Sequence, residues 1–120
     1  MRKIESQMND AIAEDRNWTS GNTSVHFDAD DNVSRVYLHG NHIATVSEDG
    51  VQLFDGGWQS NTTKSRLNAI CDAHAMDGER VFQKDFAWFV RQVNNATGKH
   101  ETVPFFSGIN LGESALPVRN

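Results

Sequence analysis

The hydrophobic positions near the start of the chain repeat with the period of a helix. Ile4, Met8, Ala11 and Ile12 recur at intervals of three and four residues and fall on one stripe, while charged and polar residues occupy the positions between them. The pattern predicts an amphipathic helix over residues 2–15.

After a polar turn at residues 19–22, apolar and polar residues alternate in short segments. This alternation is typical of strands that bury one face. The segments are residues 24–27, 33–39, 42–47 and 51–54. Gly40-Asn41 and Asp49-Gly50 separate the last three segments and indicate tight hairpin turns. The pattern predicts a three- or four-stranded antiparallel meander.

A second helix is predicted over residues 62–77, after a sharp reversal that Gly56-Gly57 allows. Its apolar face has helical spacing and consists of Leu67, Ile70, Cys71 and His74. Three residues with short side-chain oxygens can cap its first turn, namely Asn61, Thr62 and Thr63. Gly78 is the expected residue just beyond its end.

The C-terminal third returns to strand-like alternation. Residues 81–83 and 86–93 are expected to form a hairpin around Lys84-Asp85. A further strand is predicted at residues 101–105, at a sheet edge, because Pro104 has no N–H to donate to a neighbouring strand. Residues 107–120 have few apolar anchors and are expected to form a loose tail.

These elements predict a single α+β domain that spans residues 1–120. Its antiparallel sheet consists of the meander and the C-terminal hairpin, with two helices packed on one face, in the order α-β-β-β(-β)-α-β-β-β. A chain of 120 residues can form one modest core, and contents of 38% hydrophobic and 22% charged residues are typical of a folded protein.

Charge and cysteine content narrow the classes of function. The net charge of −5 argues against an extended nucleic-acid interface, which usually requires a basic face. A single cysteine, Cys71, excludes an internal disulfide. No apolar run is long enough to span a membrane and no signal-peptide core is present, so we expect a cytoplasmic location without membrane contact.

The start of the second helix carries the residues most suited to binding an anion. Hydroxyls, free backbone N–H groups and two cations meet there, from Thr62, Thr63, Lys64, Ser65 and Arg66. Cations are unfavourable at a helix N-terminus, whereas the same groups together suit a phosphate. A second interpretation stays open, in which Lys64 and Arg66 pair with carboxylates on neighbouring strands or lie in solvent.

Two further pairs of residues are candidates for metal binding or catalysis. His39 and His42 flank the predicted hairpin tip and could approach each other as zinc ligands, and Cys71 with His74 could form a thiolate–imidazole pair on the second helix. Neither pair has a third group at motif spacing, and exposed turn histidines and a core-edge pair are the simpler interpretations. The sequence predicts no catalytic residue, no metal and no cofactor, and we do not expect an enzyme.

The chain holds more aromatic surface than a core of this size is expected to bury. The residues concerned are Trp58, Trp88, Phe89, Phe105 and Phe106. Aromatic residues left exposed would mark a protein-binding patch, because aromatic residues concentrate binding energy at interfaces.

Along most of its length, the chain resembles small uncharacterised proteins of tailed bacteriophages. The stretches that carry the resemblance are Met1-Arg2-Lys3-Ile4-Glu5, Leu38-His39-Gly40-Asn41, residues 62–69, Val81-Phe82-Gln83-Lys84-Asp85 and Thr102-Val103-Pro104-Phe105. The resemblance implies a viral origin, and small phage proteins of this kind often bind host machinery. Together with the acidic charge, the absence of catalytic motifs and the surplus aromatic residues, it predicts a non-enzymatic accessory protein in the host cytoplasm that binds a host protein, such as an inhibitor of a defence or transcription component.

A second resemblance concerns topology. Helix, three strands and helix is the order of a double-stranded-RNA-binding domain, which contacts phosphates from the start of its second helix. Lys64 and Arg66 stand at the corresponding place. The chain departs from that family in its acidic charge, its extra strands and the absence of a lysine cluster. The alternative function is therefore nucleic-acid or phosphate-ligand binding through the second helix.

Overall fold

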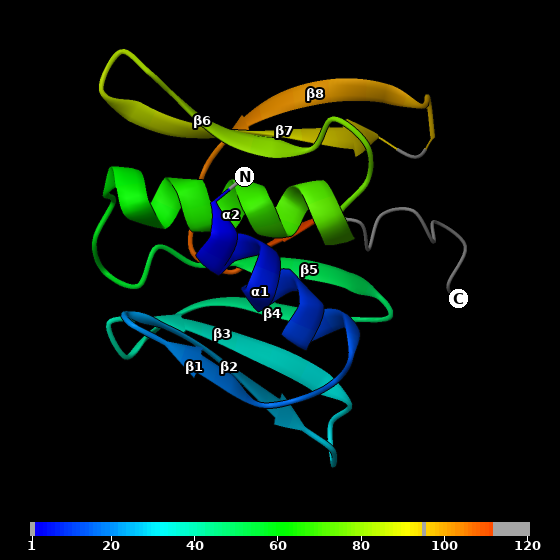
Figure 1. Cartoon of the computed structure of the whole chain (residues 1–120). Coiled ribbons are helices and arrows are strands. Elements are labelled where there is room, and N and C mark those ends of the chain that lie inside the picture. Colours follow the sequence, from blue (N-terminus) through cyan, green and yellow to red (C-terminus); the bar gives the residue numbers. More distant parts are fainter. Residues whose placement is uncertain (1, 95, 112–120) are drawn as a thin grey trace.

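The computed structural model describes residues 2–94 and 96–111, which form two helices and nine strands (Figure 1). In chain order these are α1 (Lys3–Ala13), β1 (Trp18–Ser20), β2 (Thr23–Asp28), β3 (Val33–Leu38), β4 (Asn41–Ser47), β5 (Gly50–Leu53), α2 (Asn61–His74), β6 (Arg80–Lys84), β7 (Ala87–Asn94), β8 (Lys99–Pro104) and β9 (Ile109–Leu111).

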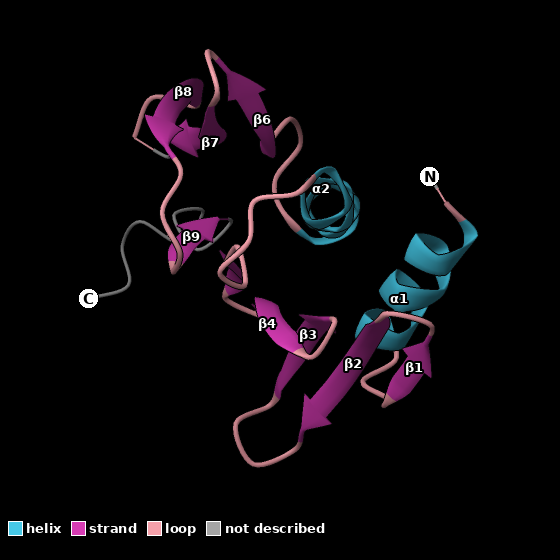
Figure 2. Cartoon of the chain, turned by 90° about the vertical axis from the view of Figure 1, so that its left-hand side faces the viewer, coloured by secondary structure: helices cyan, strands magenta, loops and turns pink. Residues whose placement is uncertain are grey.

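The predicted α+β class is confirmed, and the strands are divided between two antiparallel sheets. The larger sheet has the order β1-β2-β3-β4-β5-β9, and the smaller has the order β6-β7-β8. α1 and α2 pack on one face of the larger sheet, and α2 lies between this sheet and β6 (Figures 1 and 2). The C-terminal hairpin therefore forms a sheet of its own on the far side of α2, because β9 occupies the free edge of β5.

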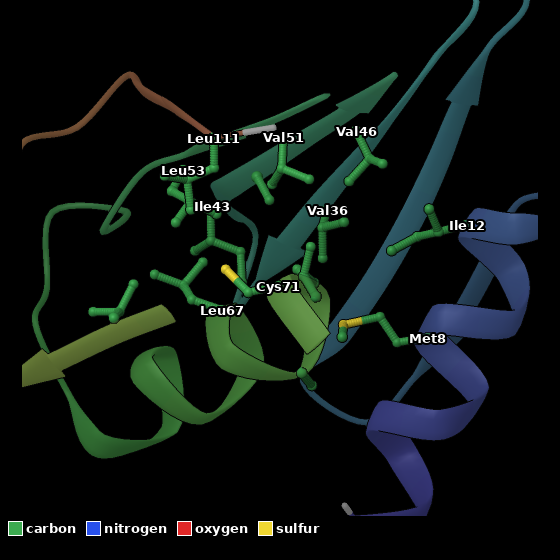
Figure 3. Close-up of a cluster of buried hydrophobic side chains, with 14 of the residues drawn as sticks. Met8, Ile12, Val36, Ile43, Val46, Val51, Leu53, Leu67, Cys71 and Leu111 are labelled. Carbon is green, nitrogen blue, oxygen red and sulfur yellow. The ribbon is translucent and has the colours of Figure 1, made fainter. Parts of the chain in front are cut away.

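The core fills the space between the larger sheet and the helices (Figure 3). Met8 on α1, Val36 on β3 and Leu67 on α2 have no solvent-accessible surface, and Leu53 and Leu111 close the core beside β9. Burial of one such aliphatic side chain contributes roughly 1.5 to 3 kcal/mol to folding. The apolar stripes predicted for both helices are confirmed as core-facing.

A β-bulge in β4 sets which side chains face outward. The register between β3 and β4 shifts so that Val36 pairs with Ala44 and Tyr37 pairs with His42. Ile43 and Ala44 are both buried in the core as a result. The extra residue reverses the alternation, and His42 lies on the face of the sheet that carries no helix.

The start of α2 differs from the prediction by its capping residue. The N-cap is Ser60, whose Oγ accepts a hydrogen bond from the backbone N–H of Thr63 at 3.1 Å. Asn61, Thr62 and Thr63, the predicted caps, belong to the helix itself. Ser60 takes this role because its backbone is extended, whereas a residue already inside the first turn cannot cap it.

α2 ends at His74, three residues before the predicted end. Ala75 is extended, and the N–H of Met76 donates to the Glu79 carboxylate at 2.9 Å, which draws the chain out of the helix. Gly78, with φ of +86°, lies in the following turn and does not cap the helix. The buried Glu79 also accepts a bond from the N–H of Val93 at 2.9 Å and so fastens this turn to β7.

Four turns lie at positions that differ from those predicted. The hairpin between β4 and β5 turns at Glu48-Asp49 and not at Asp49-Gly50, because Gly50 already pairs with Ser47. The hairpin between β3 and β4 turns at His39-Gly40, and the one between β6 and β7 turns at Asp85-Phe86; all four residues have positive φ. The predicted turn at residues 19–22 is narrower, because residues 18–20 form β1 and pair with β2. Asn and Gly are favoured in such turns, but a two-residue hairpin of this kind needs positive φ at both central positions, so His39 and Phe86 adopt the left-handed conformation there.

The end of the chain contains one more strand. Ile109–Leu111 form β9, and both Ile109 and Leu111 are buried. The rest of the predicted tail, residues 112–120, lies outside the described residues. β8, which contains Pro104, is an edge strand as predicted.

Asn68 joins α2 to the smaller sheet. Its side-chain Nδ2 donates to the Val81 carbonyl at 2.9 Å, and its Oδ1 accepts from the Val81 N–H at 2.7 Å. β6 is an edge of its sheet, and these two bonds satisfy backbone groups that would otherwise stay open.

Replacing Asn68 with alanine is expected to destabilise the protein by about 2 kcal/mol, because a partly buried N–H and C=O both lose their partner. Urea denaturation measures the change. Asp72→Ala is the matched control on an exposed position of α2 and should stay within about 0.5 kcal/mol of the wild type. Equal stability of Asn68→Ala and wild type would show that Asn68 does not hold β6 to the helix.

Neither of the two helices in the described residues has the length and apolar character that crossing a membrane requires.

Candidate functional site

Arg66, a predicted anion ligand, is buried and already paired. Its Nη1 donates to the Glu5 carboxylate on α1 at 2.8 Å, and the side chains of both residues are about 4% exposed. Its Nε donates to the Thr23 hydroxyl at 3.0 Å and its Nη2 to the Asn22 side-chain oxygen at 3.3 Å. This confirms the interpretation in which Arg66 meets a carboxylate, although that carboxylate comes from α1 and not from a strand.

Two of the other predicted ligands are also engaged within the protein. The Ser65 hydroxyl donates to the same Glu5 oxygen at 2.6 Å. Thr63 is buried, and its hydroxyl donates to the Trp58 carbonyl at 3.2 Å. Lys64 lies at the surface, where its Nζ contacts Gln83 on β6 at 3.4 Å, and Thr62 is half-buried. The five predicted residues thus do not converge on one external point.

The Glu5 carboxylate explains why a cation, Arg66, is tolerated in the first turns of α2. Burial alone would raise the pKa of Glu5, but the hydrogen bonds from Ser65 and Arg66 outweigh this effect and lower the pKa below its usual range. Glu5 is therefore ionised at neutral pH. The charges of Glu5 and Arg66 compensate each other inside the protein, which removes the electrostatic conflict with the helix dipole.

The pairs His39/His42 and Cys71/His74 do not have the surroundings that zinc binding or a thiolate–imidazole pair requires. His39 lies exposed in a turn, while His42 is half-buried and its Nε2 contacts the Thr45 hydroxyl at 2.8 Å. Burial raises the pKa of the Cys71 thiol to about 12 and lowers the pKa of His74, so both groups are neutral at neutral pH. Within the described residues, no three His, Cys, Asp or Glu side chains gather to hold a metal ion.

The segments that carry the exposed aromatic side chains lie on one side of the molecule. Trp58, Phe86 and Phe106 are the large hydrophobic residues that are exposed among the described residues, by 74%, 98% and 60%. They belong to the β5–α2 loop, the β6–β7 turn and the β8–β9 connection, and all three segments face the viewer in Figure 2. We call Trp58, Phe86 and Phe106 the aromatic surface.

The loop that carries Trp58 is held in place by its backbone. Gly56 has a φ of +68°, and a side chain there would approach Asn41 Cβ to 3.1 Å, so only glycine fits. The N–H of Gly57 donates to the Asp55 carboxylate at 2.7 Å, and the Trp58 N–H donates to the Asp55 carbonyl at 3.2 Å. Trp58 is therefore presented to solvent on a fixed backbone.

The same loop is tied to the segment that carries Phe106. The N–H of Asp55 donates to the Ser107 hydroxyl at 3.1 Å, and this hydroxyl donates to the Asp55 carboxylate at 3.2 Å. The N–H of Gly108 also bonds to the carbonyl of Leu53 at 2.7 Å. Trp58 and Phe106 thus project from two loops that are linked to each other.

Trp58 and Phe106 are among the aromatic residues that the sequence predicts to exceed the core, whereas the strand alternation predicts Phe86 to lie on a strand. Phe86 occupies the second turn position between β6 and β7, with φ of +67°, and its ring has no strand neighbour to cover it. The polar stretch Gln83-Lys84-Asp85 is the signal that could have identified the exposed position of Phe86. It is compatible with a turn at Asp85-Phe86, one residue after the predicted turn at Lys84-Asp85. Trp88 and Phe105, by contrast, pack in or against the core.

Comparison with known proteins gives one match. A family model described as Kyanoviridae Gp96 protein covers residues 1–112. None of the curated proteins and none of the solved structures matches the chain significantly. The family match extends over nearly the whole sequence and includes both helices, every described strand and the aromatic surface. The chain therefore belongs to the Kyanoviridae Gp96 family, a family of proteins of tailed phages that infect cyanobacteria.

Proposed function

We propose that this phage protein is a non-enzymatic accessory protein that binds a host protein in the cytoplasm of the infected cell. The observation that carries the proposal is the aromatic surface, with three large rings left in water at one side of a small domain. Aromatic anchors surrounded by polar residues are the usual centres of binding energy at protein interfaces. Inhibition of a defence or transcription component is the consequence we expect from such binding.

The geometry favours protein binding over phosphate binding. Ser65 and Arg66 already satisfy Glu5, so a phosphate at the start of α2 would have to compete with a buried carboxylate. Lys64 is the remaining cation among the predicted ligands. Exposed aromatic rings, in contrast, need no internal bond to be broken before they bind, and Trp58 already has a fixed backbone.

A capture experiment tests the proposal. The immobilised protein should recover a stoichiometric partner from a cyanobacterial lysate. With the variant Trp58→Ala/Phe86→Ala/Phe106→Ala, the amount of partner recovered should fall at least about tenfold. Each substituted side chain lies in solvent, so the variant should fold as the wild type does.

The matched control replaces three exposed polar residues away from the aromatic surface, as Arg16→Ala/Asp30→Ala/Glu48→Ala, and should leave the recovery unchanged. Equal recovery by the wild type and by the aromatic variant would contradict the proposed surface. The absence of any stoichiometric partner would contradict the proposed function.

A further inference from the structure

The face of the larger sheet that carries no helix presents a row of aromatic rings. The row crosses four neighbouring segments of chain through His26, Tyr37, His42 and Phe54. Ring centroids lie 5.1 Å apart from His26 to Tyr37, 5.5 Å from Tyr37 to His42 and 4.4 Å from His42 to Phe54. The ring planes are inclined to one another by 83°, 43° and 36° in the same order, so the row presents ring edges and tilted faces across the strands. We call this row the strip.

A second row, of polar side chains, runs beside the rings. The strand register places His26 opposite Arg35, Arg35 opposite Thr45, Thr45 opposite Gln52 and Gln52 opposite Asn110. Arg35, Thr45, Gln52 and Asn110 each have a buried residue on both sides in their strand and lie on the outer face. His26, which follows the buried Val25, belongs to both rows and is the point where they meet. The row thus offers hydrogen-bonding groups from β2 to β9, one for each strand that it crosses.

Two hollows lie along these rows. One has a volume of about 340 Å³ and is lined by Ser24, His26, Arg35 and Tyr37, among others. The second, of about 200 Å³, is lined by Thr45, Gln52 and Asn110, among others. The hydrogen bond between His42 Nε2 and Thr45 Oγ1 joins the ring row to the second hollow. An extended ligand fits this arrangement better than a compact one.

The polar groups on this face are fixed, and the acidic groups among them outnumber the basic one. Arg35 pairs with Asp28 at 2.8 Å and with Asp31 at 3.2 Å, and the Gln52 amide donates to the Gly108 carbonyl at 3.1 Å. Burial lowers the pKa of His42, so its ring is uncharged at neutral pH. A nucleic-acid strand would meet two carboxylates beside a single guanidinium here, which disfavours its phosphates.

We propose that this face binds a neutral oligosaccharide. The C–H faces of pyranose rings pack on aromatic rings such as those of Tyr37, His42 and Phe54, while the sugar hydroxyls exchange hydrogen bonds with the neighbouring polar row. The spacing between strands, about 4.8 Å, is comparable with the length of one pyranose unit, so successive units can meet successive strands. A ligand without negative charge also suits a site whose carboxylates, Asp28 and Asp31, outnumber the guanidinium of Arg35.

This site is separate from the aromatic surface proposed for protein binding. His26, Tyr37 and His42 lie on β2, β3 and β4, whereas Trp58, Phe86 and Phe106 lie in loops and turns. Phe54, the last ring of the row, lies at the start of the β5–α2 loop that also carries Trp58, so the variants that test this site are placed at His26 and Tyr37, on strands away from that loop. A loss of sugar binding by these variants is distinguishable from a loss of protein binding by the aromatic surface.

The test is an NMR titration of the ¹⁵N-labelled protein with cellohexaose, mannohexaose and xylohexaose, and with a single-stranded oligothymidylate for comparison. We expect at least one hexasaccharide to shift the amides of Tyr37, His42 and Phe54 saturably, with a Kd of about 1 mM or tighter. No shift with any of the three sugars, or shifts confined to other surfaces, would overturn the proposal. Salt-sensitive binding of the oligothymidylate at these residues in place of the sugars would also overturn it.

The sugar affinities of single-residue variants show which side chains contribute to binding. Tyr37→Ala should weaken binding about tenfold, because it removes the central ring of the strip, and His26→Ala about threefold. His26 is exposed, so its replacement tests the strip even where Tyr37→Ala does not retain the native spectrum. Trp58→Ala is the matched control and should bind as the wild type does. Unchanged affinity of His26→Ala, or equal weakening by Trp58→Ala, would contradict the assignment.

Discussion

The variant Arg66→Ala is expected to lose about 3 to 5 kcal/mol of the free energy of unfolding. Removing one member of a buried ion pair leaves the other charge without compensation in a medium that solvates it poorly. Here the remaining charge is Glu5, which keeps, among the described residues, the hydrogen bond from Ser65 and the weak backbone contact from Arg2. Since small domains have total stabilities of about 5 to 15 kcal/mol, urea denaturation should register a large shift of the midpoint.

The chain offers an exposed pair of the same chemistry as a matched control. Arg16 contacts Glu14 at 2.7 Å, and these two side chains are 45% and 60% exposed. Arg16→Ala should cost less than about 1 kcal/mol, because solvent already screens the pair. Comparable losses for Arg66→Ala and Arg16→Ala would show that burial of the Glu5–Arg66 pair does not determine its contribution.

The dependence on pH gives a second readout of the same pair. The pKa of Glu5 in the folded protein lies below its usual value of about 4.5, so its contribution is present above that pH and is lost as the pH falls through the folded-state pKa. In Arg66→Ala, burial without a cation raises the pKa of Glu5, and protonation relieves the penalty. The stability difference between wild type and variant should therefore narrow between pH 7 and pH 3. A constant difference over this range would exclude Glu5 as the partner that matters.

Helical periodicity and strand alternation were sufficient to predict the layers of this fold. The stripe of Ile4, Met8, Ala11 and Ile12 and the face of Leu67, Ile70 and Cys71 depend only on local geometry, and all but the partly buried Ile4 lie in the core. The division of the strands into two sheets could not be predicted in this way. It depends on which edge β9 occupies and on Asn68 bonding to β6, and both contacts join residues that are far apart in the sequence, where periodicity gives no information.

The predicted anion site shows where sequence reasoning reaches its limit. The presence of Arg66 in the first turns of a helix was a correct sign of an unusual environment, because the helix dipole disfavours it. Its partner, Glu5, lies 61 positions away in the sequence, and no local pattern connects the two residues. The outer ring row was missed for a related reason, since the bulge at Ile43 that turns His42 outward is visible only in the strand register.

The second large effect is expected at Trp88. This residue lies on β7, is 5% exposed and packs edge-on against Phe105, with 5.4 Å between ring centroids. Trp88→Ala should destabilise the protein by about 3 to 5 kcal/mol, because it leaves a cavity between the smaller sheet and the core. Thermal unfolding followed by circular dichroism measures the change, and Trp88→Phe should recover a substantial part of it because the ring contact with Phe105 is retained.

Trp58 provides the matched comparison, since the same residue type stands 74% exposed in the β5–α2 loop. Trp58→Ala keeps the backbone hydrogen bonds of that loop and should change the free energy of unfolding by less than about 0.5 kcal/mol. A ring that contributes nothing to folding and yet is held on a fixed backbone is available for a partner. If Trp58→Ala lowered the free energy of unfolding as much as Trp88→Ala does, Trp58 would be a residue that supports the fold. The aromatic surface would then lack its largest anchor.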